Sequence, residues 1–128
     1  MMLSIDGKEY GGIVTALKRS FEVADGENAG RTLDGVMHRD LIGTYYNFGI
    51  TINTDLISQE EYNELYETIS APVDSHQIEV AYGNDILTFK AYITQGSDDL
   101  IRQYSESNRY WGNLSFNFIA MEPQRRAT

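Results

Sequence analysis

The chain contains no cysteine among its 128 residues. Disulfides, thiolate metal sites and a cysteine nucleophile are therefore excluded, and a reducing compartment is permitted. Long apolar runs are also missing, since the longest cover only a few residues and a membrane-spanning helix needs about 20. The first eight residues show neither the basic nor the apolar segment of a signal peptide. We therefore expect a soluble protein made in the cytosol.

Positive charge is scarce as well. Ten Lys and Arg residues stand against nineteen Asp and Glu, which gives a net charge of −9. The basic residues are scattered, apart from the pairs Lys18-Arg19 and Arg125-Arg126. A negative balance of this size disfavours nucleic acid and anionic membranes as partners. We expect neither membrane association nor specific nucleic-acid binding.

The remaining composition is that of one globular domain rich in β-structure. The length is typical of one domain, and no linker-like stretch divides residues 1–128. Hydrophobic residues make up 41% of the chain and aromatics 12%. Such aromatic enrichment favours strands and interfaces over a helical bundle.

Alternation of apolar and polar residues predicts most of the strands. The clearest pattern puts six side chains on one face, which predicts a strand of about ten residues with that face in the core. These six are Ile42, Thr44, Tyr46, Phe48, Ile50 and Ile52. On the other face, Gly43 and Gly49 indicate bulges or the close approach of a neighbouring backbone. Further strands are predicted at residues 17–23, in a hairpin over 77–94 and at 114–118.

Asp6-Gly7 predicts a tight hairpin turn, because both central positions of such a turn need positive φ. Gly11-Gly12 separates this hairpin from the next strand. The sequence from Ser58 to Glu61 predicts a capped helix near residues 59–70, which Pro72 ends. Its apolar stripe, which would lie on a sheet, consists of Tyr62, Leu65, Tyr66 and Ile69.

Two polar stretches, residues 24–35 and 95–109, are predicted to be long loops, which in compact domains are usually functional or mobile. The sum is six or seven strands and one helix. The fold class is therefore mainly β (α+β): two packed antiparallel sheets, as a β-sandwich or a partly open barrel, with one flanking helix.

Enzyme signatures are largely missing, because the chain has no phosphate-binding glycine loop, nucleophile elbow or HExxH motif. The best catalytic candidate is a group of acidic residues around one histidine, which could act as a general base or bind a hard metal. Its members are Asp34, His38 and Asp40, with Asp25 and Glu27 nearby. Polar residues before a strand are the simpler interpretation. We expect no enzyme, no metal and no cofactor.

Four other patterns have purely structural interpretations that we favour or hold open. Glu60, Glu64 and Glu67 share a helix face that is typical of a solvated surface, and His76 begins a strand. Residues 25–28 are acidic and contain glycine but lack the spacing of a calcium loop. Four tyrosines on predicted outer faces or in loops could form a carbohydrate platform or a protein interface, or merely cover sheet edges. They are Tyr45, Tyr92, Tyr104 and Tyr110.

Two segments, RTLDGVMHRDLIGT at residues 31–44 and WGNLSFNFIAMEP at residues 111–123, resemble small proteins of phage and prophage tail gene clusters of Gram-positive bacteria. The order of the loop-then-strand motif, the capped helix and the closing aromatic strand is also similar. The resemblance implies a tail-tube-like domain over residues 1–128, with two packed sheets and a flanking helix. It also implies a hexameric ring in which long loops contact the next ring.

The resemblance therefore implies a virion structural protein, a tube or other tail subunit that assembles with itself and with other tail proteins. Its place would be the virion tail, after synthesis in the bacterial cytoplasm. The expected subunit interface comprises Arg31, Leu33, Asp34, Met37, His38, Arg39, Tyr45, Tyr104, Arg109 and Tyr110. The alternative is a monomeric β-sandwich module that binds carbohydrate or protein.

Overall fold

The computed structural model describes residues 3–10, 14–52 and 57–127, and the structural statements below concern these residues. The fold is mainly β with one helix, as the sequence predicts, and the sheet does not close into a barrel. The predicted break at Gly11-Gly12 lies outside the described residues.

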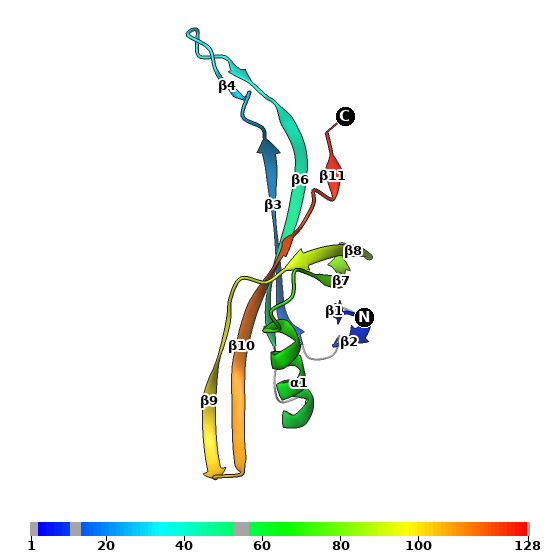
Figure 1. Ribbon diagram of the computed structural model, residues 1–128, viewed down its shortest axis with the longest axis vertical. Coiled ribbons are helices and arrows are strands. Elements are labelled where there is room, and N and C mark those ends of the chain that lie inside the picture. The colour runs from blue at the N-terminus through cyan, green and yellow to red at the C-terminus, as the bar shows by residue number, and fades with distance from the viewer. Residues whose placement is uncertain (1–2, 11–13, 53–56, 128) are drawn as a thin grey trace.

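A long antiparallel layer forms the spine of the molecule (Figure 1). Its strands are, in spatial order, β3 (Val14–Asp25), β6 (Leu41–Ile52), β10 (Asn108–Ala120) and β9 (Gly96–Ser105). A short layer crosses it, in the order β2 (Lys8–Glu9), β1 (Leu3–Ile5), β7 (His76–Tyr82) and β8 (Asp85–Tyr92). The upper end of β10 also pairs with β8, which joins the two layers.

The core lies where the two layers cross. The long layer contributes Phe48, Ile50, Leu114, Phe116 and Phe118, and the short layer contributes Leu3, Ile5, Ile78, Val80, Phe89 and Ala91. The helix α1 (Gln59–Ile69) closes one side of this core with its buried Tyr62, Leu65 and Ile69. Ser58 caps it, because its hydroxyl accepts a hydrogen bond of 3.1 Å from the amide of Glu61.

The predicted hairpins of the short layer are confirmed. Asp6 and Gly7 adopt φ values of 50° and 91°, and they turn the chain between β1 and β2. Tyr82 pairs with Asp85, so Gly83 and Asn84 form the tight turn between β7 and β8.

The strand β6 changes partners halfway along its length. Its lower half pairs with β10, whereas Gly43 and Thr44 pair with β11 (Arg125–Arg126). Between the two, the side-chain amide of Gln124 bonds to both the N–H and the carbonyl of Tyr46, each at 2.9 Å. A Cβ on Gly43 would collide with the Arg125 carbonyl, which confirms the expected close approach there. At Gly49 that expectation is wrong, since a Cβ would meet no atom within 4 Å.

Both predictions of a long loop are wrong. Residues 95–109 are not a loop, because they contain β9 and the start of β10, which pair with one another through several bulges. Residues 24–35 are not one irregular loop either: β4 (Gly30–Arg31) pairs with β5 (Met37–His38) in a small second sheet. The strand count is accordingly higher than six or seven in the described chain.

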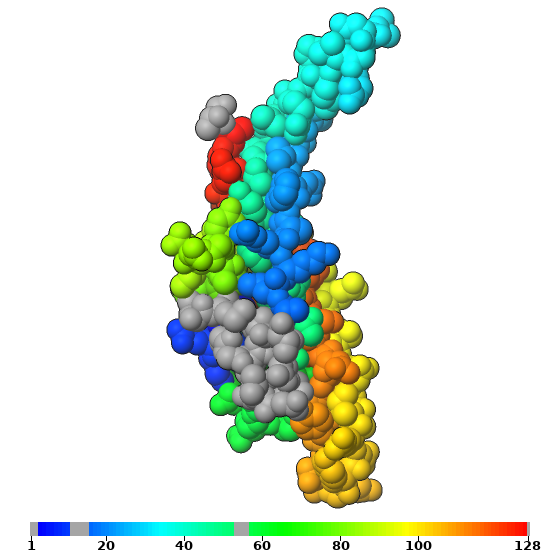
Figure 2. Space-filling view, turned by 180° about the vertical axis from the view of Figure 1, so that it is seen from behind, coloured from blue at the N-terminus to red at the C-terminus, as the bar shows by residue number. Residues whose placement is uncertain are grey.

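Two ribbons project beyond the core in opposite directions (Figures 1 and 2). The arm, residues 20–47, is the upper part of β3 and β6 with the β4–β5 hairpin at its tip. The lower ribbon, residues 99–112, is the paired part of β9 and β10 below the helix. Ile42 of the predicted core face is exposed, because it lies on the arm, above the short layer.

Candidate functional site

The tip of the arm is an ordered hairpin. The amide of Gly35, whose φ is +84°, donates to the Thr32 carbonyl at 2.9 Å. The Asp34 carboxylate accepts hydrogen bonds from the Val36 amide, at 3.1 Å, and from the Thr32 hydroxyl. Together these bonds lower the pKa of Asp34, with the Thr32 hydroxyl as the main cause. Arg31 donates to the Gly35 carbonyl at 2.9 Å.

The base of the tip is fixed by a second acidic residue. Both carboxylate oxygens of Asp25 lie 2.9 Å from Nε of Arg39, and one of them accepts from the Asp40 amide at 3.1 Å. The Arg39 hydrogen bond holds the pKa of Asp25 below its usual value. Gly26 fits tightly against Asp40, whose side chain a Cβ would meet at 2.6 Å.

The proposed catalytic group is therefore not assembled. The carboxylates of Asp25 and Asp34 each accept a hydrogen bond from a backbone amide, and Asp25 also binds Arg39. His38 lies exposed in β5 opposite Gly30. Among the described residues, no three His, Asp or Glu side chains are grouped so that they could hold a metal ion. The calcium-loop pattern at residues 25–28 has no further support, since Asp25 is bound to Arg39.

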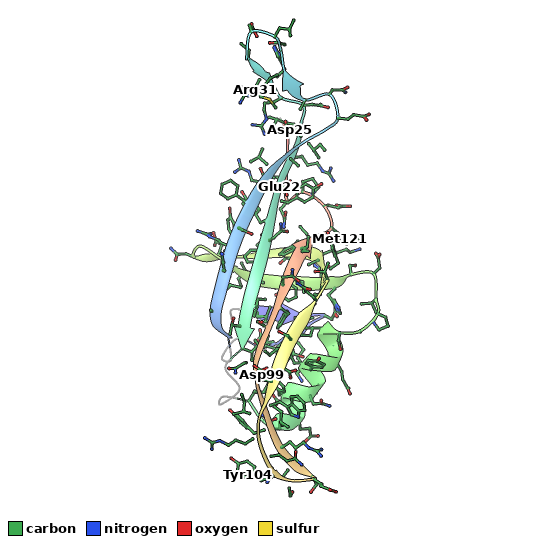
Figure 3. All side chains as sticks on the ribbon, turned by 90° about the vertical axis from the view of Figure 1, so that its left-hand side faces the viewer. Glu22, Asp25, Arg31, Asp99, Tyr104 and Met121 are labelled. Carbon is green, nitrogen blue, oxygen red and sulfur yellow. The ribbon has the colours of Figure 1, made fainter. Side chains whose placement is uncertain are left out.

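The ten predicted interface residues separate into two distant groups. Arg31, Leu33, Asp34, Met37, His38 and Arg39 all lie at the tip of the arm. Tyr104, Arg109 and Tyr110 lie on the lower ribbon, and Figure 3 places Arg31 and Tyr104 at opposite ends of the molecule. Tyr45 is half-buried in the arm, opposite Glu22. The tyrosines proposed as one platform are therefore not brought together.

Both ribbons expose apolar side chains. At the arm tip Leu33 is fully exposed, and Val36 and Met37 are exposed beside it. Along β3, Phe21 is 72% exposed. On the lower ribbon the exposed apolar residues are Leu100, Ile101, Tyr104 and Trp111. Two-stranded ribbons are marginally stable alone, so surfaces of this kind are typical of segments that pack against a partner.

The two outer strands of the long layer have free edges. Within the described residues, β3 pairs only with β6, and β9 pairs only with β10. These edge strands are 12 and 10 residues long. A long unpaired edge presents a row of N–H and carbonyl groups that another strand can bind. Sequence reasoning missed the β9 edge, because it assigned this segment to a loop.

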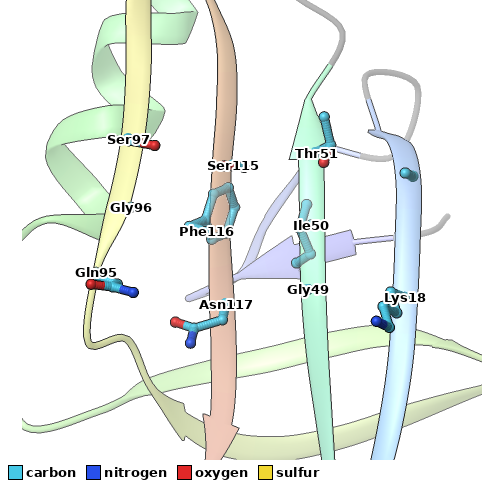
Figure 4. A pocket seen from close by; sticks show the side chains of 11 residues that line it. Lys18, Gly49, Ile50, Thr51, Gln95, Gly96, Ser97, Ser115, Phe116 and Asn117 are labelled. Carbon is cyan, nitrogen blue, oxygen red and sulfur yellow. The ribbon is translucent and has the colours of Figure 1, made fainter.

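The face of the long layer opposite the core is polar and built from small residues. A shallow open hollow of about 640 Å³ runs across it between β3 and β9 (Figure 4). It is lined by Ala16, Lys18, Gly49, Thr51, Gln95, Gly96, Ser97, Ser115 and Asn117, with Ile50 and Phe116 at its floor. This face contrasts with the other one, which the helix and the short layer cover.

The helix carboxylates and His76 are either exposed to solvent or bonded to a neighbouring residue. Glu60, Glu64 and Glu67 lie on the exposed face of α1, where Glu64 forms an ion pair of 3.0 Å with Lys8. His76 is buried, and its Nδ1 lies 2.7 Å from a carboxylate oxygen of Asp6. The other oxygen of Asp6 accepts from the Gln77 amide at 2.9 Å, which ties the first hairpin to β7.

The Asp6 carboxylate is expected to make stability depend on pH. Burial raises its pKa, but the hydrogen bonds from His76 and Gln77 and the nearby imidazole outweigh this effect and lower it. A lowered folded pKa means that the contribution is complete above the unfolded value, about 3.9, and is lost as the pH falls through the folded value. Asp6→Asn keeps the turn, because Asn accepts positive φ. It should lower the free energy of unfolding by roughly 0.5–1.5 kcal/mol at neutral pH.

Urea unfolding of both chains from pH 7 to about pH 3 measures this difference, which should shrink below pH 4. The control is Asp74→Asn, an exposed carboxylate with no hydrogen bond or ion pair in the described chain. A gap between wild type and Asp6→Asn that stays constant over the whole range would contradict the role of the carboxylate charge.

Comparison of the chain with protein-family models, curated proteins and solved structures gave no match. The single helix in the described part of the chain is too short to span a membrane.

Proposed function

We propose that this chain is a structural subunit of a phage or prophage tail, which assembles into a closed ring through β3 of one copy and β9 of the next. The observation that carries the proposal is the pair of long free edges on opposite sides of one four-stranded layer. An interface between two different surfaces of the same chain generates a ring when its rotation closes.

The strand directions fit this pairing. Neighbouring strands from β3 to β9 are all antiparallel, so β3 and β9 run in opposite directions. A neighbour in the same orientation therefore brings its β3 antiparallel to β9. The antiparallel layer then continues from subunit to subunit, and the unpaired N–H and carbonyl groups of each edge strand bond to the neighbouring copy.

The two faces of the layer fit the inside and the outside of a ring. The helix and the short layer add their bulk to one face only. Subunits joined edge to edge curve away from that bulk, which leaves the small polar face of Figure 4 toward the centre. The arm and the lower ribbon then project to the two rims, where their apolar residues meet other copies or other tail proteins.

The assignment to a tail rests on the resemblance of residues 31–44 and 111–123 to phage tail proteins. That resemblance implies ring assembly and loops that contact the next ring. The first segment forms the arm tip with the start of β6, and the second forms β10 from Trp111 to its upper end and the chain after it. The alternative, a monomeric carbohydrate module using the four tyrosines as one platform, loses its motivating observation because Tyr45 lies on the arm whereas Tyr104 and Tyr110 lie on the lower ribbon.

Engineered disulfides test the edge pairing, since the natural chain has no cysteine. Ser20→Cys in β3 is combined in turn with Ser97→Cys, Asp99→Cys or Ile101→Cys in β9, which samples the register. Paired strands bring Cβ atoms to within disulfide distance, about 3.5–4.5 Å. We expect one combination to give a ladder of covalent oligomers under mild oxidation that ends at a discrete size.

Each single-cysteine chain should yield dimers at most. The matched control is Glu60→Cys with Glu67→Cys on the exposed face of α1, which should give no ladder with a discrete end. The ring proposal is wrong if the wild-type chain sediments as a monomer up to high concentration and no β3–β9 combination cross-links.

A further inference from the structure

A small pocket lies between the helix and the strands β9 and β10, on the face of the long layer that the helix covers. It has a volume of about 230 Å³ and is lined by Gln59, Tyr62, Asn63, Tyr66, Asp98 and Trp111. These residues come from α1, β9 and β10, which Figure 3 shows lying together in the lower half of the molecule. Pockets for drug-sized ligands measure roughly 300–1,000 Å³, so this one accommodates a single small ring.

The walls of the pocket are held in place by hydrogen bonds. The side-chain amide of Gln59 accepts from the Trp111 N–H at 2.9 Å and donates to the Trp111 carbonyl at 3.3 Å. The Gln59 side chain thereby bonds to the backbone of β10 at Trp111, beyond the residues of β10 that pair with β6. The Tyr62 hydroxyl donates to Asp98 at 2.8 Å, and burial together with this carboxylate raises the pKa of Tyr62. The helix is therefore fixed to both β9 and β10 before any ligand arrives.

Two polar groups in the pocket keep free hydrogen-bonding capacity. Asp98 uses one carboxylate oxygen for Tyr62, and its other oxygen has no partner in the described chain. The Asn63 side chain makes no hydrogen bond to any described residue. The pocket thus offers an acceptor from Asp98 beside an amide that can both donate and accept.

This combination selects among ligand chemistries. A phosphate or carboxylate would be repelled by Asp98, and the lining holds no Lys or Arg to offset it. An ammonium group would leave the Asn63 donors unmatched, because it has no acceptor. A hydroxyl group both donates and accepts, so neighbouring hydroxyls of one ligand satisfy Asp98 and Asn63 together.

The aromatic walls add a second requirement. Trp111, the one tryptophan of the chain, is 39% exposed at the pocket, and Tyr66 is partly exposed beside it. The face of an aromatic ring is negative, so it attracts weakly positive C–H groups. A ring with hydroxyls on its rim and C–H groups on its face matches both requirements. We propose that this pocket binds one sugar ring of a carbohydrate, with Trp111 and Tyr66 against its face and Asp98 and Asn63 on its hydroxyls.

The fluorescence of Trp111 provides the test, because no other tryptophan contributes. A panel of methyl hexosides and methyl N-acetylhexosaminides is titrated into the wild-type chain at a concentration where it is monomeric, so that ring assembly does not enter. A ligand of about a dozen heavy atoms is expected to bind with a roughly millimolar dissociation constant. The binding glycoside should shift the Trp111 emission in a saturable manner.

Asn63→Ala and Asp98→Asn should each weaken the binding of that glycoside about tenfold. Asp98→Asn retains an oxygen for Tyr62, so the pocket keeps its shape. Asn84→Ala, in the exposed turn between β7 and β8, is the control and should bind as wild type.

Choline chloride and sodium phosphate serve as the cationic and anionic probes. A saturable response to choline or phosphate, with none to the glycosides, overturns the proposal. A flat response to the whole glycoside panel overturns it as well. Glycoside binding that Asn63→Ala and Asp98→Asn leave unchanged would place the sugar elsewhere and would also overturn it.

Discussion

Phe118→Ala is expected to lower the free energy of unfolding by about 3–5 kcal/mol, which is the usual cost of truncating a buried phenylalanine to alanine. Phe118 is fully buried in β10, where the long layer meets the short one. It lies opposite Phe48, and its ring packs edge-to-face against Phe116 at a centroid distance of 5.4 Å. Removing the ring leaves a cavity that these neighbours cannot fill without leaving their own positions.

The matched control is Phe21→Ala, the same chemical change at a side chain that is 72% exposed. A surface substitution of this kind is usually neutral to within about 0.5 kcal/mol. Both variants are compared with the wild type by urea unfolding at a concentration where all three chains are monomeric. Equal losses in the two variants would mean that the core is not centred on the crossing of the two layers.

The sequence predicts the structure well where one face of an element is buried. Burial of Phe48, Ile50 and Ile52 creates the period of two in β6, and burial of Tyr62, Leu65 and Ile69 creates the helical period of α1. The turn at Asp6-Gly7 is predictable for a local reason, since few residues accept its positive φ.

Prediction fails on the projecting ribbons, and the cause is physical. Residues of β9 have solvent on both faces over most of the strand, so no apolar alternation is required of them. Their strand conformation comes from pairing with β10. At most paired positions the partner residue is 8 or more residues away along the chain, so a local sequence pattern does not reveal the pairing. In the same way, the polar composition of residues 24–35 predicts a loop. The strand β4 within this stretch is nevertheless ordered, because it pairs with β5.

The candidate site was predictable only in part. The arm-tip residues from Arg31 to Arg39 do gather in space, because they are neighbours in the chain. The grouping of Asn63, Asp98 and Trp111 depends on how α1 docks on the ribbon, which the spacing of these residues does not reveal. The acidic residues around His38 show the converse case, since a pattern suggestive of chemistry turns out to fix the hairpin.

The largest effect on assembly is expected from a charge placed on either free edge. Phe21→Lys on β3 and Leu100→Lys on β9 should each reduce the association constant at least about thirtyfold, since loss of a central apolar contact in an interface often costs about 2 kcal/mol. Inward-pointing lysines also discourage edge pairing directly. Both native side chains are exposed in the isolated chain, so neither variant should lose stability. Sedimentation velocity over a concentration series measures the effect, with Val73→Lys, exposed after α1, as the control.

Mixing the two variants distinguishes a ring from a symmetric dimer. If β3 of one copy pairs with β9 of another, the Phe21→Lys chain retains an intact β9 edge and the Leu100→Lys chain retains an intact β3 edge. The mixture should then form heterodimers and stop there, because the outer edges of each heterodimer are both blocked. If β3 paired with β3 about a two-fold axis, Leu100→Lys alone would associate as the wild type does and the mixture would gain nothing. Heterodimers without larger species are therefore the result that only the head-to-tail pairing of β3 with β9 produces.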